Sequence, residues 1–285
     1  MFDDTTLSAT SKKQYTTKLQ QWLAFSASSI TDLEADPQYA METLHAAPIA
    51  QTPTNRHLYL SAMVAYVQHI AEDKSRLHEW KKVQMENSEP LREHYGTKEP
   101  TERQKDKHIA WPTLEAKRLT LPQGSQERLL LTLYTCMEPV RADYYATALI
   151  KEGEDTEEPN YIVLSDPPRL ILTDFKTKKR YHTLENQFPP VVAEELKSSL
   201  EKHPRSYLFV TETNAPYTRK LFSNWACRAL TRILGQPMTL TALRHLYITE
   251  KISEALPLEE MKEIAKKMGH SREMQRDYQW MGGTL

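Results

Sequence analysis

Glycine, cysteine and long apolar runs are all scarce in this chain. Seven glycines in 285 residues are too few for a turn-dense all-β fold, so the composition favours helices. The two cysteines, Cys136 and Cys227, do not suffice for a disulfide framework or a thiolate metal site. No apolar run approaches the ~20 residues of a membrane span, and the start, MFDDTTLSATSKK, lacks the apolar part of a secretory signal. We therefore expect a soluble, intracellular protein with no membrane partner.

A glycine-rich phosphate loop is also missing, which argues against nucleotide-driven chemistry. The formal net charge is −1, which argues mildly against binding to nucleic acid, and neither the first hundred residues nor the remainder is basic. Basic residues cluster only locally, most densely in the sequence KTKKR at residues 176–180. Charge alone leaves the partner undecided.

Hydrophobic periodicity predicts a mainly α-helical chain with one small antiparallel β-sheet, an α+β fold. The expected helices cover residues 8–25, 53–70, 126–135, 191–202, 220–234, 241–253 and 258–268. Short β-prone runs cover residues 161–164, 170–175 and 181–184, with KTKKR as a basic turn between the last two. The polar, charged and proline-interrupted residues 88–110 predict a linker between a helical domain, residues 1–87, and a second domain, residues 111–285.

Two arginines lie in apolar surroundings. Arg244 is flanked by leucines in TLTALRHLYITE, and Arg141 follows an apolar helix and a proline turn in LLLTLYTCMEPVRADYY. Arginine is rarely buried without a partner, so each needs either a structural carboxylate or a bound anion. Near the end of the chain Gly269 is placed to end a helix, His270 follows it, and Tyr278 comes eight residues later. Together with the basic turn, these residues suggest a pocket that grips phosphate.

In this order the stretches resemble the boxes of the tyrosine recombinases, the phage integrase superfamily. LYTCMEPVRADYY resembles the first arginine box, LILTDFKTKKRYHTL the lysine hairpin, TALRHLYITE the second arginine box and MGHSREMQRDYQW the tyrosine box. The stretches SATSKKQYTTKLQQWLAF and TPTNRHLYLSAMVAYVQHI resemble two helices of the family's core-binding domain. The resemblance implies a helical, SAM-like core-binding domain, a catalytic domain, and five catalytic residues: Arg141, Lys176, Arg244, His270 and the nucleophile Tyr278.

The implied reaction is site-specific DNA recombination or integration through a 3′-phosphotyrosine intermediate. Arginines stabilise the charge on the phosphate oxygens, and a lysine protonates the departing 5′-oxygen. The tyrosine keeps the energy of the broken bond for religation, so no cofactor and no metal are expected. Further DNA contacts are expected at Lys12, Lys13, Arg56, Lys178, Lys179 and Arg180, and the partner is double-stranded DNA bound by a dimer or tetramer.

One position departs from the family. The second box usually begins with His or Lys three residues before the arginine, and here that residue is Thr241. Threonine can hydrogen-bond a phosphate but cannot act as a base, so activity could be reduced. We interpret His245 and the pair Asp143–Tyr144 as structural, with the pair bracing Arg141. The departure also suggests a eukaryotic mobile element or a large DNA virus as the source, and a location with the DNA, in the nucleus, a viral factory or a prokaryotic cytoplasm.

Two alternative functions stay open. A type IB topoisomerase uses the same chemistry, and a DNA-binding protein on a catalytically impaired recombinase scaffold would account for Thr241. The integrase-like N-terminal helices favour recombination over relaxation, and the retention of five catalytic positions argues against an impaired enzyme.

Overall fold

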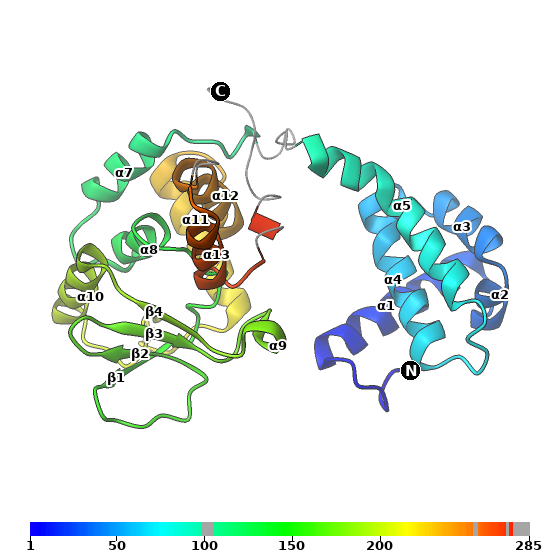
Figure 1. Cartoon of the computed structure of the whole chain (residues 1–285), viewed down its shortest axis with the longest axis horizontal. Helices are drawn as coiled ribbons and strands as arrows, with labels where there is room; N and C mark the ends of the chain where they lie inside the picture. The colour runs from blue at the N-terminus through cyan, green and yellow to red at the C-terminus, as the bar shows by residue number, and fades with distance from the viewer. Residues whose placement is uncertain (98–104, 253–255, 272–273, 276–285) are drawn as a thin grey trace. The chain divides into compact units, whose positions relative to one another are not determined.

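The computed structural model describes residues 1–97, 105–252, 256–271 and 274–275. The chain divides into two compact units, residues 1–97 and 98–285 (Figure 1). Each unit has its own hydrophobic core. Among the described helices, none is both long and apolar enough to cross a lipid bilayer.

The first unit is entirely helical in its regular structure. Its elements are α1 (Ala9–Ser26), α2 (Ile30–Ala35), α3 (Pro37–Ala46), the 3₁₀ turn η1 (Pro48–Ala50), α4 (Pro53–His69) and α5 (Leu77–Thr97). Helices α1 and α4 confirm the two predicted from periodicity. The core is built around Trp22, whose ring meets those of Tyr59 and Trp80 edge-on at centroid distances of 6.2 and 6.3 Å. Such contacts suit aromatic quadrupoles and add to the burial of their large apolar surfaces.

Helix α5 continues to Thr97, through ten residues that the sequence assigns to a linker. Its polar residues hold it to α4: Gln84 Nε2 donates to Ser61 Oγ at 2.8 Å, and Asn87 Nδ2 donates to the carbonyl of Pro53 at 3.0 Å. At the next residue, the Ser88 hydroxyl lies 2.9 Å from His57 Nδ1. Apolar periodicity does not detect a helix that docks through side-chain hydrogen bonds, so the sequence did not predict α5.

The second unit has a helical body around α8 (Gln126–Thr135), whose bounds match the predicted ones. Helix α8 contacts the surrounding helices, and all its residues from Leu129 to Thr135 are buried. The other helices are α7 (Trp111–Thr120), α10 (Pro190–Lys202), α11 (Arg219–Leu234), α12 (Leu240–Lys251) and α13 (Leu258–Lys267). The fold is mainly α with a small sheet, as the sequence predicts.

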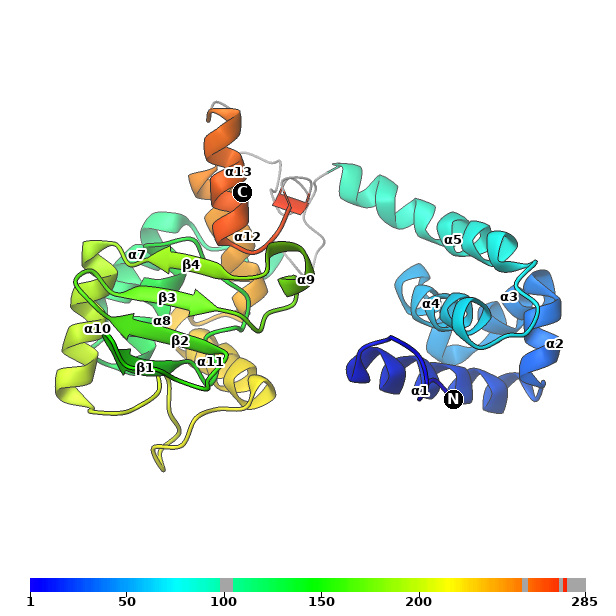
Figure 2. The ribbon, with the colours of Figure 1, turned by 60° about the horizontal axis from the view of Figure 1, so that its bottom comes forward.

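The sheet is mixed, which corrects the prediction of an antiparallel one. Its strands lie in the order β1 (Ala148–Lys151), β2 (Asn160–Leu164), β3 (Arg169–Leu172) and β4 (Leu184–Gln187) (Figure 2). The pairs β2–β3 and β3–β4 are antiparallel, whereas β1, which periodicity missed, pairs parallel to β2. The β-prone run 181–184 is also shifted, because residues 178–181 form the short helix α9 (Lys178–Tyr181) and β4 starts only at Leu184. Helix α13 lies against β4, which brings the end of the helical body to the sheet.

Two glycines provide a test of the packing of this unit. Gly124 and Gly235 have φ of +75° and +74°, but a Cβ on Gly124 would lie 2.7 Å from the carbonyl oxygen of Ser198, while a Cβ on Gly235 would meet nothing within 4 Å. Gly235→Ala should therefore cost only the left-handed strain, about 1–2 kcal/mol. Gly124→Ala should cost about 1–3 kcal/mol more through overpacking. Urea unfolding followed by circular dichroism measures both, and equal losses would contradict the packing described.

Candidate functional site

The C-terminal end of α13 is the point at which the predicted site residues meet. The helix closes with a Schellman motif: His270 N–H donates to the carbonyl of Ala265 at 3.0 Å, and Gly269 N–H donates to that of Lys266 at 2.9 Å. Gly269 has a φ of +66°, and a Cβ there would lie 3.1 Å from Leu184 Cδ1. The predicted helix end at Gly269 is confirmed, and it sets His270 directly after the helix.

Two carbonyl groups at this helix end gather side chains from distant parts of the chain. Arg141 Nη1 donates to the carbonyl of Gly269 at 3.1 Å, and Thr177 Oγ1 donates to the same oxygen at 2.7 Å. Arg244 Nη2 donates to the carbonyl of Met268 at 3.2 Å. The end of a helix carries partial negative charge, so it stabilises two adjacent guanidinium groups. The fold therefore brings both box arginines and the lysine hairpin to one place.

Arg244 is 1% exposed, which confirms that this arginine is buried. Its Nε donates to the carbonyl of Pro139 at 3.0 Å, and its Nη2 lies 3.1 Å from Nδ1 of His270. A carboxylate or an anion was the predicted partner, whereas in the structure backbone carbonyls accept from Arg244. These contacts fix the plane of the guanidinium group before any ligand binds.

His270 is 2% exposed and is held in its neutral form. Burial, together with the positive charges of Arg244 and Arg141, lowers the pKa of His270 to about 3. Because a guanidinium group has no acceptor, Nδ1 of His270 accepts from Arg244, and the ring proton lies on Nε2. His270 is thus suited to donate a hydrogen bond to an anion rather than to transfer a proton at neutral pH.

A pocket of about 240 Å³ opens beside these groups, between the loop after α8 and the first turns of α11 and α12. Its lining includes Arg141, Arg219, Ser223, Thr239, Thr241 and Arg244. Thr241 is exposed in the first turn of α12, while the Thr239 hydroxyl caps that helix by accepting from the Ala242 N–H at 3.1 Å. The pocket lining combines cationic and hydroxyl groups, which suits an anion.

The predicted lysine hairpin lies between β3 and β4. Lys176 is exposed and directly precedes Thr177, the residue bound to the carbonyl of Gly269. Lys178 pairs with Asp174 at 2.5 Å. The other basic residues of the segment, Lys179 and Arg180, are exposed. The contact of Thr177 ties the segment between β3 and β4 to the site, and Lys176 beside it is exposed.

The predicted DNA-contacting residues in the first unit differ in how many hydrogen bonds they already make within that unit. Lys13 is exposed, and Lys12 Nζ donates to the carbonyl of Asp3 at 2.7 Å. Arg56 is used within the unit, because its Nη1 donates to the carbonyls of Ala50 and Gln51 at 3.1 and 2.9 Å, and its Nε to the side chain of Asn87. Their contact with DNA stays a prediction.

Tyr278, the predicted nucleophile, lies outside the described residues. Before it, the described residues include a helical turn that starts at Ser271, whose hydroxyl accepts from the Met274 N–H at 3.3 Å and whose carbonyl accepts from the Gln275 N–H at 2.9 Å.

Arg141 is supported by Tyr134, a residue for which the sequence predicted no such role. Tyr134 on α8 donates its hydroxyl to the carbonyl of Arg141 at 2.6 Å, and Tyr144 packs on Tyr134 at a ring distance of 5.7 Å. Asp143 pairs instead with Arg219 Nη1 at 2.9 Å. The predicted brace therefore runs through Tyr144 and Tyr134. Asp143 joins a further arginine to the site, and nothing in the local sequence signals that pairing.

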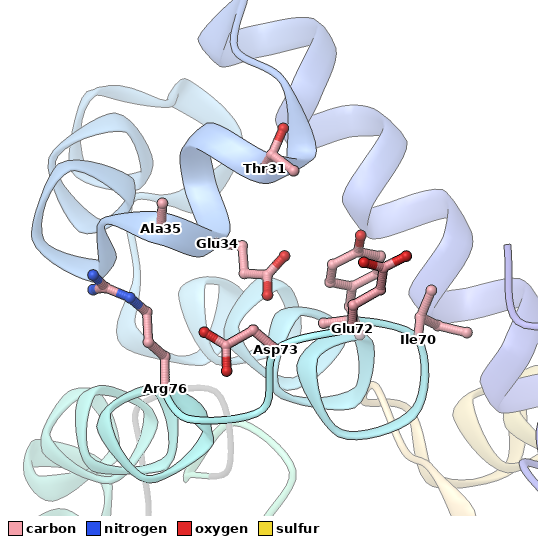
Figure 3. Close-up of a pocket in the computed structure, with 9 residues that line it drawn as sticks. Thr31, Glu34, Ala35, Ile70, Glu72, Asp73 and Arg76 are labelled. Carbon is pink, nitrogen blue, oxygen red and sulfur yellow. The ribbon is translucent and has the colours of Figure 1, made fainter.

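A second pocket, in the first unit, has more acidic than basic side chains in its lining, unlike the pocket beside Arg141 and Arg244. Figure 3 shows the carboxylates of Glu34, Glu72 and Asp73 turned toward it, with Tyr66 and Arg76 also in its lining. Burial raises the pKa of Glu34, and the charge of Asp73 acts in the same direction. Clustered carboxylates repel phosphate, so this pocket is unsuited to DNA. Among the described residues, no group of three or more His, Cys, Asp or Glu side chains could hold a metal ion.

Comparison with known proteins gives a likeness in structure but none in sequence. No protein-family model matches the chain, and no curated protein matches it. Solved structures do match, among them the crystal structure of XerA recombinase, with a TM-score of 0.47 and 13% sequence identity over 97% of this chain and 89% of that chain.

Proposed function

We propose that this chain is a site-specific DNA recombinase or integrase that cleaves and rejoins DNA through a covalent 3′-phosphotyrosine at Tyr278. The supporting observation is the convergence of Arg141, Arg244 and His270 at the end of α13, although Arg141 and Gly269 are 128 residues apart in the sequence. Two guanidinium groups that line one pocket, with a neutral imidazole hydrogen-bonded to one of them, suit the stabilisation of a phosphoryl transition state.

The phosphate is held by groups whose charge does not change. Arg141 and Arg244 donate to the non-bridging oxygens, on which negative charge increases in the pentacoordinate transition state. His270, with its proton on Nε2, supplies a third donor. Because the carbonyls of Pro139 and Met268 fix the Arg244 guanidinium beforehand, little reorganisation is needed when DNA binds.

The reacting groups are Tyr278 and Lys176. The phenolic oxygen of Tyr278 bonds to phosphorus as the bond from phosphorus to the 5′-oxygen breaks, and Lys176 gives its proton to that oxygen. Thr241 has no basic atom, so water accepts the proton of the phenol. Religation reverses the same steps with a new 5′-hydroxyl group.

Double-stranded DNA is the proposed partner, and two or four copies of the chain assemble on it, so the protein is located with its DNA. Exposed Lys13, Lys179 and Arg180 suit sequence-independent phosphate contacts. Arg56 is the weakest of the proposed contacts, because several of its donors already bind within the unit.

The proposal is tested with nicked duplexes taken from the DNA that flanks the gene. The nick lets the short 5′-hydroxyl fragment diffuse away, so the covalent complex accumulates and is resolved by denaturing electrophoresis. We expect an adduct at one defined position. Relaxation of supercoiled plasmid without any preferred site would favour a topoisomerase, and tight DNA binding with no adduct would favour a catalytically impaired protein.

A further inference from the structure

Arg219 is a third arginine in the pocket, and no catalytic box contains it. It is the first residue of α11, where Thr218 caps the helix by accepting from the Leu221 N–H at 3.3 Å. Its Nη1 donates to Oδ1 of Asp143 at 2.9 Å, and its guanidinium carbon lies 5.7 Å from the ring centroid of Tyr145. Both partners belong to the segment that follows Arg141, so the guanidinium is held at two points next to the first box.

The two sides of the Arg219–Asp143 pair differ in exposure. The side chain of Asp143 is 4% exposed, whereas that of Arg219 is 45% exposed. A buried carboxylate requires a partner, so Asp143 needs Arg219. Arg219 has five N–H donors, and one of them meets this need. Among the described residues its recorded contacts are Asp143 and Tyr145, so the arginine keeps donors for a ligand in the pocket that it lines.

The pocket also faces the starts of two long helices. Arg219 begins α11, and Thr241 lies in the first turn of α12, so the positive ends of two helix dipoles act beside three guanidinium groups. Ser223, one turn into α11, adds a hydroxyl group to the lining. Arg141 and Arg244 are engaged with the end of α13, whereas Arg219 is anchored separately through Asp143. The pocket therefore holds more phosphate-binding groups than a single phosphodiester requires.

We propose that Arg219 binds a second DNA phosphate, the neighbour of the scissile one on the same strand, with Ser223 beside it and Asp143 as the positioning residue. This inference rests on the proposed recombinase function. When separately anchored arginines bind two adjacent phosphates, the DNA strand is held in one position. That position determines which phosphodiester lies beside Arg141, Arg244 and His270. Arg219 thus contributes to DNA binding and to the choice of the cleaved bond.

The first test measures salt dependence of duplex binding by fluorescence anisotropy. Arg219→Gln should reduce the magnitude of the negative slope of log K, the DNA association constant, against log salt by about 0.9, the value for one phosphate contact. Arg219→Lys should keep most of the slope. The matched control is Arg232→Gln, on the same helix, where the arginine pairs with Glu127 at 2.8 Å and its side chain is 70% exposed; its slope should equal that of the wild type. An unchanged slope in Arg219→Gln would overturn the proposal.

Should Arg219→Gln fail to fold, because it leaves Asp143 buried without its cation, the double variant Asp143→Asn/Arg219→Gln removes both charges. Thermal unfolding checks each protein. The double variant should show the same reduced slope, and a slope equal to that of the wild type would overturn the proposal.

The second test locates the phosphate. Nicked substrates carry one uncharged methylphosphonate in turn at each position around the mapped cleavage point. In the wild type, neutralising the neighbouring phosphate should slow adduct formation roughly tenfold or more, as expected for one charge-assisted hydrogen bond. Arg219→Gln should be insensitive to that replacement. Equal sensitivity in both proteins refutes the role of Arg219, while a wild type that binds duplex without any adduct refutes the recombinase function itself.

Discussion

Tyr278→Phe should abolish the covalent DNA adduct and leave DNA affinity close to that of the wild type. The substitution removes the one oxygen that bonds to phosphorus and keeps every phosphate-binding group. Tyr278 is the only tyrosine after His270 in the sequence. The measurement is the yield of adduct on nicked duplex, with affinity followed by anisotropy, and peptide mapping identifies the attached residue.

Three other tyrosines of the second unit are poor nucleophiles for a physical reason. Burial raises the pKa of Tyr134, Tyr144 and Tyr247 far above the ordinary phenol value, so their hydroxyl groups resist ionisation. Tyr181→Phe, on the partly exposed helix α9, is the matched control and should form adduct normally. A phosphotyrosyl peptide that maps to any residue other than Tyr278 would end the assignment.

Arg244→Ala and Arg141→Ala should each slow single-turnover cleavage by about 10²–10³-fold, the size associated with one oxyanion contact. The two variants should differ in stability. Arg244→Ala leaves the buried carbonyls of Pro139 and Met268 without this donor. This loss should lower the free energy of unfolding by about 1–3 kcal/mol. Arg141→Ala leaves the carbonyl of Gly269 still bound to Thr177, so the free energy of unfolding of this variant should change much less.

Lys176→Ala separates the role of acid from that of charge stabiliser. A substrate with a 5′-thio leaving group needs no proton, so it should restore cleavage in this variant but not in either arginine variant. If the thio substrate rescues the arginine variants and not Lys176→Ala, the assigned roles are reversed. Thermal unfolding of each protein shows whether a lost rate reflects lost fold.

Local chemistry in the sequence determined much of the fold. The bounds of α8 follow from a cap at Ser125 and a continuous apolar run, and those of α4 from Thr52 and Pro53. The end of α13 follows from Gly269, which alone among nearby residues tolerates a positive φ without strain. Each signal acts within one or two turns of helix, so it can be read without knowledge of the rest of the chain.

The tertiary structure decided which groups support one another. The docking of α5 on α4 depends on hydrogen bonds between the two helices, and the parallel pairing of β1 with β2 depends on the whole sheet. The neutral state of His270 arises because burial and two arginines from distant segments act on one imidazole. Asp143 forms an ion pair with Arg219, 76 residues away, and not with Arg141, two positions before it. Contacts between such distant residues form only when the chain has folded, because their energy depends on burial and geometry that no local pattern specifies.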